Sequence, residues 1–527
     1  MRSLRVSIDA VWVAAAVALP ALGALLAPLT SEDLAYQVRT GDMILASRSI
    51  PSVDTLTFSA AGLPWTVQQW AAAVALAAGF APAGWTGLLV LRAVVVAAIF
   101  GLVVLACARM GVRNRTAALL AIASFVVALG GLALRAQLFG VLCFAAILAL
   151  VAGRSRSPRA FLAVPLVVLA WANVHGTFPL GLAAVAWVLL EDVAAARLPT
   201  GSPLGAAADD GAQAADAGPA PDPRALSSAV RRDMAILVLS LVATFVTPFG
   251  AGVWSYVAGL VTTPAVAGLV SEWQPTTIQT FAGATFVASV VGVAVVLGAR
   301  RRGATWPTLL WLAGLFVLGA WTERGIVWWA VGGAVAIAGV LGRAEAAGGT
   351  AHEAGGSTRG AGSIGAGPRG GARPVSIVNG VLALAIAAAP AVLAVAILSR
   401  PSDPVTGPAG VLVDAPAGIT AAVREAAPPG TRILNAQRWG SWLEWAVPDA
   451  LVYTDSRFEV IPADAWRDQV AVSSGRFDWR EIIDRIAPDL IVASRHDQQG
   501  LLDAIAADPA SGWRRVYADD DGVVLVR

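Results

Sequence analysis

Residues 9–33 read DAVWVAAAVALPALGALLAPLTSED, an apolar run that ends in two adjacent carboxylates. A helix needs about 20 predominantly apolar residues to cross the hydrocarbon core of a bilayer, and this run has that length. Of the 527 residues of the chain, 57% are hydrophobic and only 14% are charged, against roughly 25% charged residues in soluble domains. The sequence therefore predicts a polytopic α-helical membrane protein. Because no small-residue cleavage signal follows the first run, we expect it to be retained as an anchor.

The apolar runs predict about eleven transmembrane helices. They lie at 9–28, 86–107, 117–134, 136–152, 160–174, 177–194, 233–248, 278–298, 305–321, 325–342 and 376–398. The stretch 66–81 is also apolar, but it is short and interrupted. It predicts an interfacial or re-entrant helix rather than a crossing.

Arginine predicts the orientation of these helices. Arginines follow the second, fourth, eighth and tenth predicted spans, precede the first, and bracket the segment after the sixth, so all clusters fall on one side if eleven spans alternate. Since cytoplasmic loops are enriched in Lys and Arg, we expect a cytoplasmic N-terminus and an extracytoplasmic tail after residue 398. The Ala-, Gly- and Arg-rich composition is typical of a GC-rich bacterial genome, so we expect a multi-pass protein of a bacterial plasma membrane.

The domain organisation follows from shifts in composition along the chain. Two stretches rich in Gly, Ala and Pro lack large apolar residues and predict disordered cytoplasmic linkers. The tail alternates five short strand-like segments with two amphipathic helical ones, which predicts a small extracytoplasmic α/β domain. The predicted strands lie at 431–435, 450–455, 489–494, 513–519 and 522–527, and the predicted helices at 479–487 and 499–508. In order, the predicted parts are an N-terminal membrane module at 1–198 with a large outer loop at 29–85, a linker at 199–230, a second membrane module at 231–343, a linker at 344–373, a last transmembrane helix at 374–400 and the tail domain at 405–527.

Polar side chains gather at the predicted outer ends of the spans. They are Glu32, Asp33, Gln68, Gln69, Arg92, Arg135, Gln137, Asn173, His175, Glu272, Glu323 and Arg324. Polar residues near membrane depth are costly and tend to face a cavity or a partner, so we predict one polar pocket on this face. The structural alternative is that Arg92 snorkels to headgroups and that His175 is a satisfied structural histidine. Asp33, beside a second acid in a chain so poor in charge, is the strongest functional candidate.

Several classes of cofactor and partner have no support in the sequence. The three histidines are scattered, and both cysteines, Cys107 and Cys143, lie in apolar runs. This pattern predicts neither a metal centre nor a disulfide framework. No Gly-rich phosphate fingerprint is present, and a net charge of +2 gives no basic patch for nucleic acid. We therefore expect no cofactor and no nucleic-acid partner; a divalent metal would be compatible with the reaction considered below but is unsupported.

The order of several short motifs resembles bacterial membrane glycosyltransferases of the GT-C superfamily. The segment 31–70, from SEDLAYQVRTGDMIL to GLPWTVQQW, is similar to their first outer loop. Later motifs fit the same group: LRAQLF (134–139), WANVHGTFPLG (171–181), TPFG (247–250), SEWQP (271–275), ERGIVWWA (323–330) and the tail from RILNAQRWG to SRFEVI (432–461). The resemblance spans nearly the whole chain and concerns an uncharacterised subgroup.

The resemblance implies a reaction at the outer membrane face. Such enzymes take a sugar from a polyprenyl-phosphate carrier, and an acidic residue of the first outer loop acts as general base. Asp33 would be that base, with Glu32 beside it, and a single displacement would invert the anomeric carbon. The acceptor would be an envelope glycan, a lipid or a protein. The other implied roles are lipid-phosphate binding by Arg324, Arg135 and Arg92, in that order, and acceptor or sugar binding by Glu272, His175, Gln68 and Gln69.

The sequence departs from the family pattern at three positions. Gln37, Gln68 and Gln69 stand where titratable residues are expected, and a glutamine binds a sugar hydroxyl but cannot take its proton. Two alternatives follow, a non-catalytic envelope assembly or binding protein on the same scaffold and a lipid-precursor flippase. The nearly charge-free centres of the spans disfavour the flippase.

The tail carries a second candidate ligand site. Asp455 and Arg457 follow a predicted strand, at the position where α/β sheets often bind ligands. Trp439, Trp442 and Trp445 have the character of a sugar-stacking platform. The alternative is that these tryptophans pack the tail domain against the membrane interface.

Overall fold

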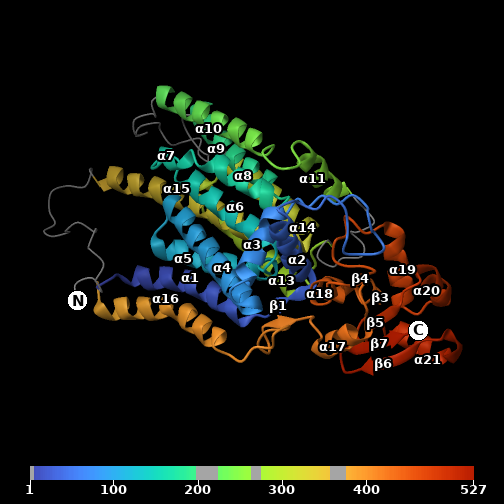
Figure 1. The fold of residues 1–527 in the computed structure, drawn as a ribbon. Coiled ribbons are helices and arrows are strands. Elements are labelled where there is room, and N and C mark those ends of the chain that lie inside the picture. The colour runs from blue at the N-terminus through green and yellow to red at the C-terminus, as the bar shows by residue number, and fades with distance from the viewer. Residues whose placement is uncertain (1–4, 198–222, 263–273, 357–374) are drawn as a thin grey trace.

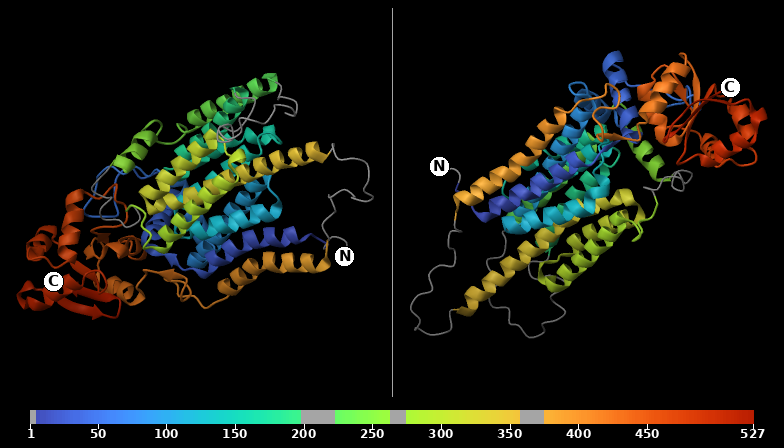
Figure 2. Two further views of the ribbon diagram at one scale, coloured as in Figure 1. Left: turned by 180° about the vertical axis from the view of Figure 1, so that it is seen from behind. Right: turned by 90° about the horizontal axis from the view of Figure 1, so that it is seen from below.

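The computed structural model describes residues 5–197, 223–262, 274–356 and 375–527. A bundle of long helices forms one part of the molecule, and an α/β domain made by the C-terminal residues lies at one end of the bundle (Figure 1). Helix α1 (Ile8–Leu26) begins at the end of the bundle far from this domain and runs toward it, as both views in Figure 2 show. The arrangement confirms the predicted polytopic helical fold with a small C-terminal α/β domain.

The helices of the bundle follow the predicted apolar runs. Besides α1 they are α4 (Gly84–Arg109), α5 (Asn114–Ala128), α6 (Ala136–Ala152), α7 (Pro158–Phe161), α8 (Val164–Val174), α9 (Pro179–Arg197), α10 (Pro223–Ala243), α11 (Gly252–Thr262), α13 (Phe281–Ala299), α14 (Trp306–Trp321), α15 (Ile326–Gly356) and α16 (Ile377–Leu398). Within the described residues, seven helical segments are long and apolar enough to cross a membrane, and they belong to α1, α4, α5, α9, α13, α15 and α16. The predicted spans at 136–152, 160–174 and 305–321 correspond to shorter apolar helices, and the one at 233–248 overlaps α10.

Burial separates the centre of the bundle from its rim. In the most apolar 18-residue window of Glu323–Ala347, a segment that includes most of α15, 83% of the residues are buried, against 6% and 11% in the corresponding windows of α16 and α13. Helix α15 therefore lies among the other helices, and α16 packs mainly along α1. The exposed apolar side chains of α16, such as Val378 and Val392, have the character of a lipid-facing surface.

Two helices extend into segments that the sequence analysis predicted to be disordered. Helix α10 begins at Pro223, inside the predicted linker 199–230, and α15 continues to Gly356, inside the predicted linker 344–373. Proline is favoured in the first turn of a helix, and the four residues directly after Arg343, AEAA at 344–347, have high helix propensity. These local preferences extend the helices beyond their apolar parts. The remaining residues of both predicted linkers lie outside the described part of the chain.

The connection between α1 and α4 contains a short strand and two helices. Strand β1 (Leu29–Thr30) leads directly into helix α2 (Ser31–Ser47), which ends at Arg48 in the left-handed conformation (φ 54°). The chain then returns to helix α3 (Trp70–Phe80), only 11 residues long, at the place where a short non-crossing helix was predicted. Helices α2 and α3 pack closely because Gly41 has no side chain: a Cβ there would lie 2.1 Å from the carbonyl oxygen of Ala73.

The C-terminal domain is built on a five-stranded sheet in the order β4-β3-β5-β7-β6. Strands β3 (Arg432–Asn435), β4 (Leu451–Val452) and β5 (Leu490–Ser494) are parallel, whereas β7 (Gly522–Val526) runs antiparallel to β5 and to β6 (Arg514–Ala518). All five predicted strands are present, as are the two predicted helices, α20 (Trp479–Ile486) and α21 (Gln499–Ala507). The sequence analysis missed α17 (Ala417–Ala426), α18 (Gly440–Ala446) and α19 (Ala463–Ser473).

A small parallel ladder connects the domain to the end of α1. Leu29 of β1 pairs with Leu412 of strand β2 (Leu412–Val413), and Thr30 pairs with Val413. The side chain of Ser31 donates a hydrogen bond of 2.6 Å to the carbonyl oxygen of Asp414. The start of α2, which carries Glu32 and Asp33, is thereby fixed against the C-terminal segment.

Candidate functional site

Asp33 lies between two arginines from distant parts of the chain. Its Oδ2 atom is 3.1 Å from Nη1 of Arg135 and 3.9 Å from Nη2 of Arg324. Asp33 is in the first turn of α2, Arg135 immediately precedes α6, and Arg324 lies in the short turn Glu323–Gly325 before α15. The three side chains are 24%, 11% and 29% exposed, so the cluster is reachable from solvent. The structure thus brings the predicted base together with two of the three predicted phosphate-binding arginines.

Glutamine side chains hold the backbone around this cluster. The Gln37 side-chain oxygen accepts a hydrogen bond of 3.1 Å from the backbone N–H of Ala136, next to Arg135. The Gln137 side-chain amide donates to the carbonyl oxygen of Arg324 at 3.4 Å. The Gln37 amide also donates, over a longer 3.5 Å, to the side-chain oxygen of Gln69. Gln37 and Gln137 therefore position the two arginines, and this role needs amides rather than titratable groups.

His175 and Gln68 lie near the ends of α3 and α8. Nδ1 of His175 is 2.8 Å from Oγ1 of Thr177. Burial first, and then the positive charges of Arg324 and Arg135, together lower the pKa of His175 to about 3, so the imidazole is neutral. The Gln68 amide is buried and donates to the carbonyl oxygen of Ala172 at 2.8 Å. Gln68 therefore links the α1–α4 connection to α8.

Arg92 lies apart from the Asp33 cluster. Its guanidinium donates to the carbonyl oxygen of Pro28 at 2.9 Å and to the carbonyl oxygens of Ala24 and Ala27. The last carbonyls of a helix have no partner within the helix, and Arg92, which is only 5% exposed, supplies donors to those at the end of α1. These contacts give Arg92 a helix-capping role, so we leave it out of the proposed phosphate site.

Glu32 faces the C-terminal domain. Its Oε1 atom accepts a hydrogen bond of 3.3 Å from the Gln437 side chain, and its backbone oxygen accepts one of 3.1 Å from Ser456. Glu272 lies outside the described residues. Among the residues that are described, no group of three His, Cys, Asp or Glu side chains is placed to hold a metal ion.

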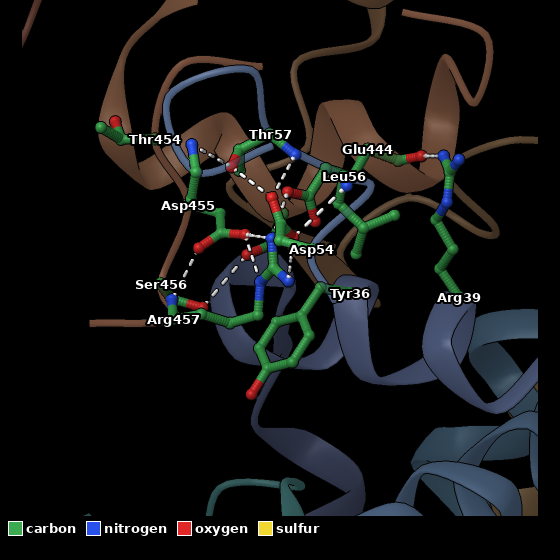
Figure 3. A network of polar contacts seen from close by, with 12 residues as sticks. Tyr36, Arg39, Asp54, Leu56, Thr57, Glu444, Thr454, Asp455, Ser456 and Arg457 are labelled. Atoms are coloured by element: carbon green, nitrogen blue, oxygen red, sulfur yellow. Dashed lines mark hydrogen bonds and ion pairs between the residues drawn. The ribbon is translucent and has the colours of Figure 1, made fainter. Parts of the chain in front are cut away.

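The second candidate site of the sequence analysis is a buried ion cluster (Figure 3). Nη1 of Arg457 is 2.6 Å from Oδ1 of Asp54 in the α1–α4 connection, and Nη2 is 2.5 Å from Oδ2 of Asp455 and 3.6 Å from Oε1 of Glu444. The guanidinium also lies over the Trp65 ring at 4.4 Å. None of the four charged side chains is more than 1% exposed. The hypothesis that Asp455 and Arg457 bind a ligand is therefore wrong; they join the two parts of the chain.

Glu444 is the fourth member of this cluster. Burial raises the pKa of Glu444 well above its usual range, and the neighbouring charge of Asp455 raises it further. The neutral form of Glu444 is favoured, so Arg457 faces two carboxylates rather than three.

The tryptophans of the tail pack against the membrane bundle. Trp445 lies 4.9 Å and Trp442 5.9 Å from Trp85, between ring centroids, at the start of α4. Trp445 also contacts Phe80 at the end of α3, at 5.5 Å. Because Trp442 is fully buried and Trp439 is 4% exposed, neither side chain is free to stack on a sugar, and packing of the tail domain against the membrane interface stays a prediction.

Glu459 is a candidate that the sequence analysis missed. It lies two residues after Arg457 and is exposed to solvent, and the hydroxyl of Tyr256 in α11 donates a hydrogen bond to its carboxylate. Surrounding protein atoms raise the pKa of Glu459; the charges of Asp455 and Asp33 add to this, and Arg457 opposes it. Burial likewise raises the pKa of Tyr36, followed by the charges of Asp33 and Glu459. Glu459 ends the YTDSRFE motif (453–459), but nothing in the local sequence shows that this motif lies beside the first outer loop.

Two clefts of the described chain lie on the C-terminal domain. One, of about 240 Å³, is lined by residues that include Phe58, Arg432 and Arg485. The other, of about 430 Å³, lies beside Gly430 and Val526. Asp33 lines neither of them.

Solved structures similar to this chain include two of an oligosaccharyltransferase from Archaeoglobus fulgidus. The apo form is 12% identical, and the form tethered to an acceptor peptide with an NVT sequon is 13% identical; each match covers 98% of this chain and 74% of the other, with a TM-score of 0.52. A third structure, of the enzyme from the same organism with an inhibitory peptide and a dolichol-phosphate, is 14% identical over 94% of this chain and 72% of the other, with a TM-score of 0.49. No protein-family model and no curated protein matches the sequence. The first two likenesses confirm the predicted GT-C-like fold.

Proposed function

We propose that the chain is a membrane glycosyltransferase that moves a sugar from a polyprenyl-phosphate carrier to a hydroxyl-bearing acceptor. The observation that carries the proposal is the position of Asp33 between Arg135 and Arg324, at 3.1 and 3.9 Å. A carboxylate and two guanidinium groups are the pieces that this reaction needs: one proton acceptor, and cations for the leaving phosphate. The GT-C-like fold supports the same class of reaction by analogy.

Each residue of the cluster has a separate task in the proposed mechanism. Asp33 takes the proton of the acceptor hydroxyl as its oxygen attacks the anomeric carbon. The bond between that carbon and the phosphate oxygen breaks, and the electron pair remains on the phosphate, whose charge Arg135 and Arg324 neutralise. With one displacement and no covalent intermediate, the configuration inverts. The reaction would take place at the outer face of a bacterial plasma membrane, with an envelope glycan, lipid or protein as acceptor.

We assign Glu459 and Tyr256 to the acceptor side of the same site. Glu459 is solvent-exposed, and the charge of Asp33 contributes to its raised pKa, which supports a position within electrostatic range of the proposed base. The turn that carries Glu459 is docked on α2, because Ser456 donates to the carbonyl oxygen of Glu32, the residue before Asp33. A carboxylate that a tyrosine orients can accept a hydrogen bond from an acceptor hydroxyl.

The glutamines that prompted the non-catalytic alternative do not argue against this proposal. Gln37 bonds the backbone beside Arg135, and Gln68 bonds the carbonyl oxygen of Ala172. Neither is asked to take a proton in the mechanism.

An assay of the purified chain in lipid nanodiscs tests the proposal. Undecaprenyl-phosphate mannose, glucose and arabinose serve as donors and octyl glycosides as acceptors, with the product identified by mass spectrometry. We expect transfer by the wild type and a loss of roughly 10²-fold or more in Arg324→Gln and in Arg135→Gln, the effect typical of removing one preorganised charge partner. The exposed Arg485→Gln provides a matched control with unchanged transfer. Equal transfer by all four proteins would refute the assignment of the phosphate site.

A further inference from the structure

Asp33 occupies the same two guanidinium groups that the proposed mechanism assigns to the phosphate. One of its oxygens, Oδ2, makes both contacts, at 3.1 Å to Arg135 and 3.9 Å to Arg324. A carboxylate and a phosphate compete for a guanidinium because both present negative oxygens to the same N–H groups. The site as described therefore holds its own anion where the donor headgroup has to bind.

We propose that Asp33 is a displaceable counter-ion, which the lipid phosphate replaces on Arg135 and Arg324 and which is thereby released to act as the base. The inference rests on the proposed function. In the described arrangement the Oδ2 lone pairs of Asp33 point toward cations. After the exchange they are available to the acceptor hydroxyl, so binding of the donor switches on the group that activates the acceptor.

The backbone around the cluster suits an exchange of partners without a large rearrangement. Arg135 is fixed as the residue before α6 by the hydrogen bond from Ala136 to Gln37, and the carbonyl oxygen of Arg324 is held by Gln137. Only the long arginine side chains have to turn. Their ion pairs with Asp33 are partly exposed, and such pairs contribute little net stability, so a doubly held phosphate can displace them.

The exchange also gives a reason for the order of events. Before the donor binds, Asp33 is paired with the two arginines and the site has no free base. An acceptor that arrives before the donor therefore cannot be deprotonated. After the phosphate takes the arginines, the proton of the acceptor hydroxyl passes to Asp33, the new glycosidic bond forms, and the carbon–phosphate-oxygen bond breaks with its electron pair left on the phosphate. Departure of the carrier phosphate restores the ion pairs with Asp33 once the proton has been lost to solvent.

Binding of undecaprenyl phosphate, without any sugar, tests the exchange. Its dissociation constant is measured by tryptophan fluorescence in nanodiscs for the wild type, Asp33→Asn, Asp33→Ser and the control Asp42→Asn, which removes an exposed carboxylate from the same helix. We expect both Asp33 variants to bind roughly twofold to fivefold more tightly than the wild type, the fold-change that corresponds to removing a partly exposed ion pair. Asp42→Asn should bind as the wild type does.

Salt separates a direct exchange from a long-range charge effect. Interactions between separated exposed charges are largely screened at about 0.5 M salt, whereas contacts within the site are screened less. We expect the tighter binding of both Asp33 variants at about 0.1 M and at about 0.5 M NaCl. The exchange is overturned if folded Asp33 variants bind undecaprenyl phosphate as the wild type does or more weakly, or if their tighter binding vanishes at high salt. Neither result contradicts the phosphate site itself. If the wild type binds no undecaprenyl phosphate, the proposed function and the exchange both fail.

Discussion

Arg457 of the C-terminal domain lies 2.6 Å from Asp54 of the α1–α4 connection, and neither side chain is exposed. The pair joins residues 403 positions apart in the sequence. It fixes the segment that carries Ser456 and Glu459 against α2, which carries Asp33. The C-terminal domain is therefore docked against the helix that carries Asp33 and is not a module attached to the bundle by a tether.

Removing one partner of this buried pair should loosen the domain. Asp54→Asn leaves Arg457 with less compensating charge, and breaking a buried pair in this way costs about 3–5 kcal/mol. We expect a clearly lower midpoint of thermal unfolding in detergent and faster proteolysis in the C-terminal domain. The control is Arg485→Gln, which breaks an ion pair with Asp468 whose arginine side chain is 60% exposed; exposed pairs are worth under about 1 kcal/mol. Equal midpoints of thermal unfolding for the two variants would contradict a stabilising role of the Asp54–Arg457 ion pair.

Glu444→Gln should be tolerated, because the wild-type side chain favours its neutral form. A carboxyl group whose pKa is raised on folding contributes most to stability below its unfolded pKa, and that contribution is lost as the pH rises toward the folded pKa. The glutamine variant has no ionisable group at this position, so it does not lose stability in this way as the pH rises. Its unfolding midpoint should therefore match the wild type near pH 5 and equal or exceed it at pH 8. A midpoint well below that of the wild type at pH 8 would show that Glu444 acts as an anion.

Arg92→Gln separates the two roles considered for this arginine. Loss of its hydrogen bonds to the carbonyl oxygens at the end of α1 leaves buried acceptors unpaired, at a cost of about 1–3 kcal/mol. We expect a lower unfolding midpoint and an unchanged dissociation constant for undecaprenyl phosphate. Phosphate binding that weakens in the folded Arg92→Gln protein as much as it does in Arg324→Gln would return Arg92 to the phosphate site.

The acceptor dependence of transfer should follow the ionisation of Glu459. Its pKa is raised, so the anion that accepts a hydrogen bond exists only above that raised value, and kcat/KM for the acceptor should fall as the pH drops through it. The surrounding protein atoms raise this pKa most; among charged groups, Asp455 and Asp33 raise it and Arg457 lowers it. Tyr36 of α2 and Tyr256 of α11 also face the Glu459 charge. Glu459→Gln should raise the acceptor KM several-fold, remove this limb of the pH profile and leave undecaprenyl-phosphate binding unchanged. An identical pH profile in Glu459→Gln would exclude Glu459 from the acceptor side, and the exposed Glu481→Gln is the matched control.

The bundle was predictable because membrane helices are specified locally. An apolar run of sufficient length spans the bilayer whatever its neighbours are, and each predicted run corresponds to a helix. The sheet of the C-terminal domain was equally readable from its short apolar strands. Helix α18 was missed because it is only seven residues long, and α19 because its apolar period is weak. Helix α17 is amphipathic, with Ile419 and Val423 on its buried face, so its signal was present in the sequence and was overlooked.

The site was predictable only in part, because contacts between distant residues carry no local signal. The topology put Asp33, Arg135 and Arg324 on one face, and the structure brings them into contact. Nothing in the sequence near Arg92 shows that it reaches the end of α1, and nothing near Arg457 reveals Asp54. Both arginines resembled ligand-binding residues, because in the sequence a charged residue that forms a buried structural contact cannot be told apart from one that binds a ligand.

The rate of sugar transfer by Asp33→Asn tests the central claim most directly. In nanodiscs, with an undecaprenyl-phosphate sugar that the wild type uses, single-turnover transfer is compared among the wild type, Asp33→Asn and the same-helix control Asp42→Asn. The account predicts that Asp33→Asn loses roughly 10²–10⁴ in rate, the usual worth of a general base, while it still binds the carrier and Asp42→Asn transfers normally. Transfer by Asp33→Asn at the wild-type rate would contradict the account.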